Sequence, residues 1–134
     1  MTKSNSDILV TLGDMEEKVV DMAAFDSCSI KIRAIHDTMD VLSGKWKVSI
    51  IACLCYQPMR YSELLKEVNG ISGKMLSREL KDLEMNKLII RKVLDTKPVT
   101  VTYQISEYGR TLKELTNVIA AWGIKHREQM VNSI

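Results

Sequence analysis

Residues 58–106 read PMRYSELLKEVNGISGKMLSRELKDLEMNKLIIRKVLDTKPVTVTYQIS, and this stretch decides the fold. Its first part predicts a short helix, because apolar residues recur at helical spacing: Tyr61, Leu64, Leu65 and Val68. Ser62 is the predicted N-cap of this helix, and Asn69-Gly70 is a typical C-terminal stop. A tight connection then leads to the next segment.

A second helix is predicted from Ser72 to Asn86. Leucines are expected to face the core at Leu76, Leu80 and Leu83. Hydroxyl and cationic side chains project from the other side, at Lys74, Ser77, Arg78 and Lys81. Acidic residues at Glu79, Asp82 and Glu84 are expected to dilute this basic face.

After this helix the period of the pattern changes from helical to alternating. Residues 88–94 have strand-like content, and apolar and polar residues alternate over residues 99–105. Residues 95–98 join the two segments as a hairpin loop. Two short helices, a tight turn and a β-hairpin follow the order of a winged helix-turn-helix, so the predicted fold is mostly α with a β-hairpin wing.

Further helices are expected on both sides of this stretch. One spans residues 29–42 and ends at Ser43-Gly44, and an apolar one spans residues 45–56 and belongs at the centre. Ser106 is expected to cap a long final helix. Residues 28–134 are predicted to form the domain. Residues 1–27 are predicted to be an extension, partly disordered or with a short helix beginning at Asp14.

Composition and charge narrow the class of protein. The 134 residues are 46% hydrophobic, which is enough for a core, and the net charge is +2. Residues 44–97 carry eleven Lys and Arg against six Asp and Glu, whereas residues 1–43 carry four against eight. This basic middle segment is expected if one substructure faces phosphates, although a solvated surface of mixed charge is the alternative reading.

Other features indicate a cytoplasmic protein with no membrane segment. The early apolar run, Ile8 to Leu12, is too short for a signal peptide or a transmembrane helix and has no basic flank. The three cysteines, Cys28, Cys53 and Cys55, have spacings that suit neither a disulfide framework nor a zinc site. Free thiols are the rule in a reducing compartment.

No catalytic or metal-binding constellation stands out. His36 and His126 are isolated on predicted helices, without a Cys, Asp or Glu at metal-ligand or catalytic spacing. Catalysis requires a nucleophile, a base and an orienting group in one pocket. We therefore expect no enzyme activity, no metal and no cofactor.

The pattern favours binding to double-stranded DNA. The outer face of the 72–86 helix suits the major groove, where Arg or Lys can pair with the acceptor edge of guanine. Lys97 at the hairpin tip and Arg91 and Lys92 on its first strand are placed to meet phosphates. Lys45 and Lys47, at the start of the central helix, are expected to add phosphate contacts. The alternative is a winged-helix protein-interaction module without specific DNA binding.

Several motifs resemble the HxlR-type family of bacterial regulators. The resemblance spans roughly residues 29–127 and consists of GKW at 44–46, PMRYSEL at 58–64, ISGKMLSRELKDLE at 71–84 and SEYG at 106–109. In the wing it adds Arg91, Pro98, Val99 and Tyr103, and in the last helix Trp122. The chain departs from the family pattern at Gln57 and Lys87, where the family usually has Gly.

The resemblance implies a homodimer that joins through its first and last helices and binds a near-palindromic operator. A small-molecule or oxidant effector is compatible with it. Together with the pattern above, it defines what we call the predicted DNA face: Arg60, Ser72, Lys74, Ser77, Arg78, Lys81, Arg91 and Lys97.

Cys28 is a candidate redox sensor by the same resemblance. Several family members sense oxidants through one cysteine just before the helix that leads to Gly-Lys-Trp, and Cys28 lies in that neighbourhood. Its spacing to Trp46 is longer than usual, and Ser29 stands where Pro often follows. A structural or idle thiol is the alternative, and Cys53 and Cys55 are expected to be buried small hydrophobes.

Overall fold

The computed structural model describes residues 28–132. The predicted N-terminal extension, including the helix expected at Asp14, lies outside the described residues. The elements follow in the order α2 (Cys28–Val41), α3 (Lys47–Leu54), β1 (Met59–Arg60), α4 (Tyr61–Glu67), α5 (Gly73–Met85), β2 (Ile89–Leu94), β3 (Thr100–Ile105), the 3₁₀ turn η2 (Gly109–Leu112) and α6 (Lys113–Asn132).

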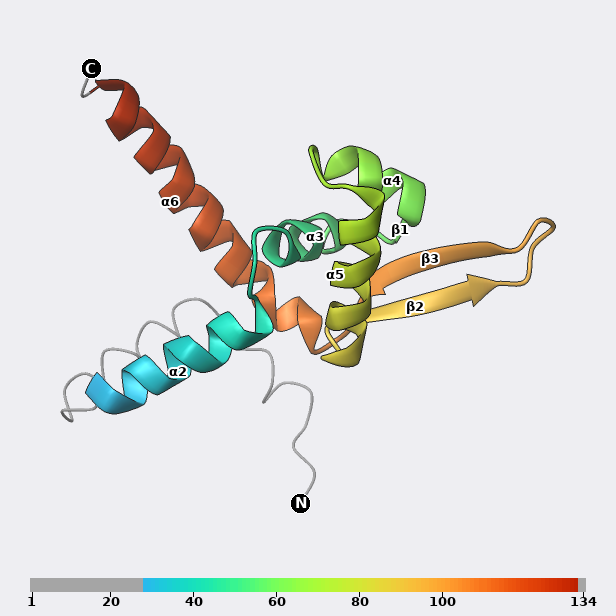
Figure 1. Cartoon of the computed structure of the whole chain (residues 1–134), viewed down its shortest axis with the longest axis horizontal. Coiled ribbons are helices and arrows are strands. Elements are labelled where there is room, and N and C mark those ends of the chain that lie inside the picture. Colours follow the sequence, from blue (N-terminus) through green and yellow to red (C-terminus); the bar gives the residue numbers. More distant parts are fainter. Residues whose placement is uncertain (1–27, 133–134) are drawn as a thin grey trace.

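The arrangement is a winged helix-turn-helix, as predicted. Helices α3, α4 and α5 cluster at the centre, the β2–β3 hairpin extends to one side, and α2 and α6 project to the other (Figure 1). The antiparallel sheet has the strand order β1-β3-β2. Strand β1 was not predicted, because its two residues are too few to show an alternating pattern.

The core lies between the three central helices and the base of the hairpin. Helix α3 contributes Ile50, Ile51 and Leu54, all nearly inaccessible to solvent. Around it pack side chains from α4, α5, the strands and the turn before β2, including Leu64, Leu76, Leu80, Leu83, Leu88, Ile89 and Ile105. The apolar character of α3 in the sequence thus corresponds to its central position, because a helix that is hydrophobic on all sides is stable only when surrounded.

Backbone turns set the ends of the helices. Gly44 and Gly70 have φ angles of +87° and +94°, in the left-handed region that glycine adopts without strain. The stops predicted at Ser43-Gly44 and Asn69-Gly70 are therefore confirmed. The N-cap predicted at Ser62 is wrong, because α4 begins at Tyr61 and its N-cap is Arg60. The carboxylate of Glu63 accepts a hydrogen bond from the Arg60 N–H at 3.0 Å and satisfies the first turn.

The junction between α5 and the wing is tight. Lys87 has a φ of +62°, in the left-handed region that favours glycine. Lys87 therefore replaces the family's usual glycine at a position where the backbone is left-handed. The prediction that Ser106 caps the final helix is wrong, because α6 begins only at Lys113, after η2. The Ser106 hydroxyl instead donates to the Lys87 carbonyl and accepts from the N–H of Gly109, the first residue of η2. A β-carbon at Gly109 would collide with the backbone carbonyl of Leu88, so this approach requires glycine.

Candidate nucleic-acid interface

The two helices of the helix-turn-helix are fixed to each other by hydrogen bonds at the start of α5. The Tyr61 hydroxyl, on α4, donates to the Gly73 carbonyl at 2.7 Å. The Ser77 hydroxyl in turn donates to the Tyr61 oxygen at 3.3 Å. Ser72 is the N-cap of α5, and its side-chain oxygen accepts from the Met75 N–H at 3.1 Å. These bonds hold the N-terminal turn of α5 in place relative to α4.

Helix α5 has one buried and one exposed face, as predicted. Leu76, Leu80 and Leu83 are at most 2% exposed. Four members of the predicted DNA face lie on the exposed side of this helix, at Lys74, Ser77, Arg78 and Lys81. Their positions differ by three or four residues, so they share one face of the helix.

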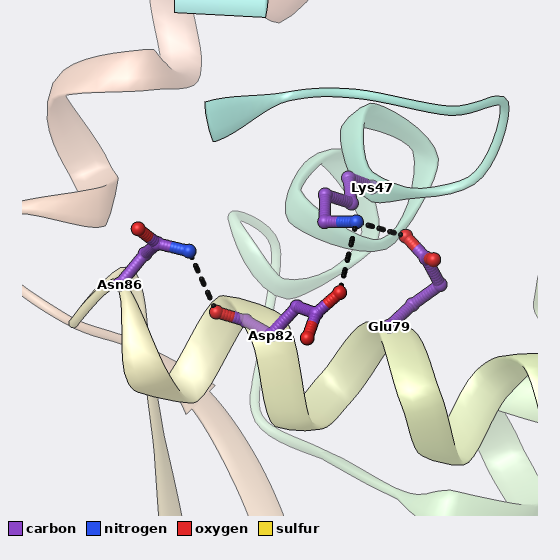
Figure 2. Close-up of polar contacts among 4 residues, drawn as sticks. All are labelled: Lys47, Glu79, Asp82 and Asn86. Carbon is purple, nitrogen blue, oxygen red and sulfur yellow. Dashed lines mark hydrogen bonds and ion pairs between the residues drawn. The ribbon is translucent and has the colours of Figure 1, made fainter. Parts of the chain in front are cut away.

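The acidic residues of α5 do not follow the sequence expectation. Glu79 is buried, and Asp82 is only partly exposed, because both carboxylates turn toward Lys47 of α3 (Figure 2). Of the three acidic residues expected to dilute the basic face, only Glu84 is exposed as expected. The outer face of α5 is therefore more basic than its sequence suggests.

Lys47 itself was expected to contact phosphates, and that expectation is wrong. The residue is 5% exposed, and its ammonium lies 2.8 Å from Oε2 of Glu79 and 3.4 Å from Oδ2 of Asp82. Burial lowers the pKa of Lys47. The hydrogen bonds and the attraction to the two carboxylates together outweigh this effect, so the pKa lies above its ordinary value of 10.5. The neighbouring Lys45 is exposed, with its ammonium 4.8 Å from the centre of the Trp46 ring.

Besides Ser72, which caps α5, the remaining members of the predicted DNA face lie on the strands and in the hairpin loop. Arg60 of β1 is exposed beside the start of α4. Arg91 pairs with Tyr103 across the hairpin and is exposed, and Lys97 is exposed in the hairpin loop. The Thr96 hydroxyl donates to the Pro98 carbonyl at 2.7 Å and braces the loop around Lys97. The wing thus carries cations at its tip and along its first strand.

The three cysteines occupy different environments. Cys28 is exposed at the first residue of α2, whereas Cys53 and Cys55 are half-buried in and after α3. The prediction that the latter two are buried is therefore met only in part. Burial, with a smaller effect of Glu67, raises the pKa of the Cys53 thiol above 9.0. Burial also raises the pKa of Cys55, against the opposing charges of Arg110 and Lys113.

Helices α2 and α6 expose apolar side chains. Helix α2 has no buried residue, and α6 has only Thr116. The exposed apolar residues on these two helices include Ile30, Ile32, Ile35, Met39, Ile119, Trp122 and Ile124. Trp122 stacks on His126, with ring centres 5.0 Å apart.

Residues 28–132 contain no group of three or more His, Cys, Asp or Glu side chains that could hold a metal ion. Within the same residues, none of the helices has the length and apolar character needed to cross a bilayer.

Comparison with known proteins identifies the family. The model of the HxlR-like helix-turn-helix family matches residues 41–131. The chain is 38% identical to the uncharacterized HTH-type transcriptional regulator YtcD of Bacillus subtilis (strain 168), over 69% of this chain and 74% of that protein. It is 40% identical to the putative regulatory protein MalR of Fusobacterium mortiferum, over 67% of this chain and 86% of that protein.

Solved structures agree. A crystal structure of a putative HTH-type transcriptional regulator ytcD superposes with a TM-score of 0.67 at 37% identity, covering 70% of this chain and 96% of that one. The redox regulator HypR in its oxidized form superposes with a TM-score of 0.66 at 29% identity, covering 69% and 95%. With the match across most of its length, the chain belongs to the HxlR-like helix-turn-helix family of transcriptional regulators.

Proposed function

We propose that this regulator binds a near-palindromic DNA operator as a homodimer, with α5 of each subunit in the major groove. The observation that carries the proposal is the exposed basic face of α5, whose Lys74, Ser77 and Arg78 project away from the core while its acidic Glu79 is turned inward. Arg and Lys recognise guanine from such a helix, and half-sites about one DNA turn apart suit a two-fold dimer.

The wing supplies contacts of a different kind. Arg91 and Lys97 are exposed on the hairpin, and Arg60 beside α4. Long cationic side chains at these positions suit phosphate oxygens, which set the register of the protein on DNA without reading its sequence. We assign base recognition to α5 and most of the salt-dependent affinity to the remaining members of the predicted DNA face.

The apolar surfaces of α2 and α6 support the homodimer. Contiguous exposed apolar residues mark interaction surfaces in soluble proteins, and a second copy of the chain would cover Ile35, Met39, Ile119 and Trp122. We infer one domain over residues 28–134, a cytoplasmic location and no enzyme activity. The free state of all three cysteines and membership of a family of transcriptional regulators support these inferences.

Selection of duplexes from a random-sequence pool tests the DNA-binding proposal. We expect two related half-sites, and an affinity for any duplex that falls steeply as salt rises, with a sequence-specific remainder. Replacing Lys74 and Arg78 together by Ala should abolish the selection. A matched control, Arg110→Ala with Lys113→Ala, removes one Arg and one Lys at exposed positions outside the predicted DNA face. Indifference to DNA at about 50 mM salt would instead favour the protein-interaction module.

A second candidate function is regulation by oxidants through Cys28. Cys28 is the favoured sensor among the three cysteines because it is exposed. Cys53 and Cys55 are half-buried, and their raised pKa values disfavour the reactive thiolate. The 29% identical HypR is a redox regulator. The proposed switch is a disulfide between Cys28 and Cys28 of the partner subunit, formed as an oxidant such as diamide takes up the two hydrogens.

Diamide titration of the DNA complex tests the switch. The wild-type chain should release DNA and form a disulfide-linked dimer. This dimer should appear on a denaturing gel and be lost when a reductant is added. The Cys28→Ser variant should stay bound, whereas Cys53→Ser with Cys55→Ser should still respond. If the wild type and Cys28→Ser respond alike, Cys28 is an idle thiol.

A further inference from the structure

The rotation of α5 about its own axis determines where its outer side chains point. Its buried face consists mainly of Leu76, Leu80 and Leu83. Apolar contacts of this kind stabilise the packed helix but are not directional. Protein cores tolerate substitutions that preserve the total volume and the hydrophobic pattern. Leucine packing alone therefore leaves the rotation of the helix loosely specified.

The contact with Lys47 is directional. Glu79 and Asp82 lie three residues apart on α5, so the Lys47 ammonium contacts two successive positions of the same face, at 2.8 Å and 3.4 Å. The Lys47 and Glu79 side chains are only 6% and 8% exposed. Rotating α5 in one direction would lengthen the contact with Glu79 and separate two buried charges, and rotating it in the other direction would lengthen the contact with the half-exposed Asp82.

A second polar anchor lies at the other end of the recognition surface. Tyr61 of α4 donates to the Gly73 carbonyl in the first turn of α5. The Lys47 contacts follow about two turns later, and Asn86 closes the helix by donating to the Asp82 carbonyl at 2.9 Å (Figure 2). Two anchors from different helices, α4 and α3, thus hold α5 at two points along its length.

We propose that Lys47 is a positioning residue for sequence recognition: by pairing with Glu79 and Asp82 it fixes the rotation of α5 and hence the direction of Lys74, Ser77 and Arg78. The inference rests on the proposed function of α5 and adds a role for a residue that does not touch DNA. Buried ion pairs commonly add little stability over apolar residues of equal volume, and they can instead specify one arrangement.

The test compares Lys47→Met/Glu79→Leu with the wild-type full-length chain. The probes are the operator selected by the wild type and an unrelated duplex of the same length, and the readout is the ratio of the two Kd values. We expect the double variant to fold and to bind the unrelated duplex normally, with the ratio reduced about tenfold, the effect of losing about one base contact. Lys47→Arg, which can keep both contacts, should retain the ratio.

Controls separate the possible outcomes. Lys113→Met with Glu114→Leu makes the same changes at exposed positions of α6 and should leave the ratio unchanged. A wild-type ratio in Lys47→Met/Glu79→Leu overturns the positioning role while leaving DNA recognition intact. If the wild type selects no sequence at all, the proposed function fails, and the positioning role falls with it.

A variant at the half-exposed partner covers the case in which the double variant does not fold. The Asp82 side chain is 46% exposed, so Asp82→Ala is expected to fold. It removes one of the two contacts and should reduce the ratio about threefold, since one exposed charge contact is worth less than a buried pair. An unchanged ratio in this variant would also overturn the proposal.

Discussion

The ammonium of Lys47 lies 2.8 Å from the Glu79 carboxylate, and both side chains are less than a tenth exposed. This pair joins the central helix α3 to α5. It removes a cation from the surface where phosphate binding was expected and removes an acid from the outer face of α5. The charge pattern of the surface therefore depends on a contact between residues 32 positions apart in the chain.

Breaking the pair from one side should destabilise the protein. Lys47→Met leaves the Glu79 carboxylate buried without a partner, and we expect the free energy of unfolding to fall by about 3–5 kcal/mol. Urea denaturation measures the change. Lys45→Met, at the exposed neighbouring cation, should cost less than about 1 kcal/mol. A loss as small as this in Lys47→Met would show that the pair is not buried in solution.

Stability should fall in alkaline solution in two steps. The folded-state pKa values of Cys53 and Cys55 are raised above 9.0, so the unfolded chain loses these protons first and stability declines as pH rises past 9.0. The pKa of Lys47 is raised above 10.5, so its contribution is complete below pH 10.5 and is lost as pH rises through the folded-state pKa.

Urea denaturation between about pH 8 and about pH 11 resolves these steps. Cys53→Ala with Cys55→Ala should remove the earlier decline, and Lys47→Met/Glu79→Leu the later one. Stability that stays constant up to pH 11 would contradict both assignments.

Lys87→Gly should stabilise the protein by up to about 1 kcal/mol. Lys87 follows α5 with a φ of +62°, which is unfavourable for a residue with a β-carbon. Glycine relieves this strain, partly offset by its greater entropy in the unfolded chain. Lys87→Ala is the matched control, because it removes the charge and keeps the β-carbon. Equal melting temperatures for the two variants would show that the backbone at this position carries no strain.

Two cations of the predicted DNA face should behave differently. Arg78→Ala should relax specificity at one base step, by about 1–3 kcal/mol, because a side chain on α5 reads a base edge. Lys97→Ala should weaken binding to all sequences and reduce the salt dependence, because the wing tip meets phosphate. Titrations of operator and unrelated duplex at several salt concentrations measure both effects. If both variants bind genomic fragments like the wild type, the predicted DNA face is wrong.

Local patterns in the sequence determined most of the fold. The leucines of α5, the alternation over residues 99–105 and the glycines at 44 and 70 identified the helices, the hairpin and the stops. They did so because helical and strand periods and left-handed glycines are properties of neighbouring residues. The same periodicity placed Lys74, Ser77, Arg78 and Lys81 on one exposed face, since side-chain direction along a helix follows from spacing alone.

Only the tertiary structure decided what each charged residue meets. Lys47 and Glu79 appear in the sequence as two ordinary surface charges, yet they are buried together because α3 and α5 cross at that point. The short strand β1 likewise exists only because β3 lies beside it, pairing Met59 with Tyr103. Such contacts join residues distant in the chain, and no local spacing encodes them.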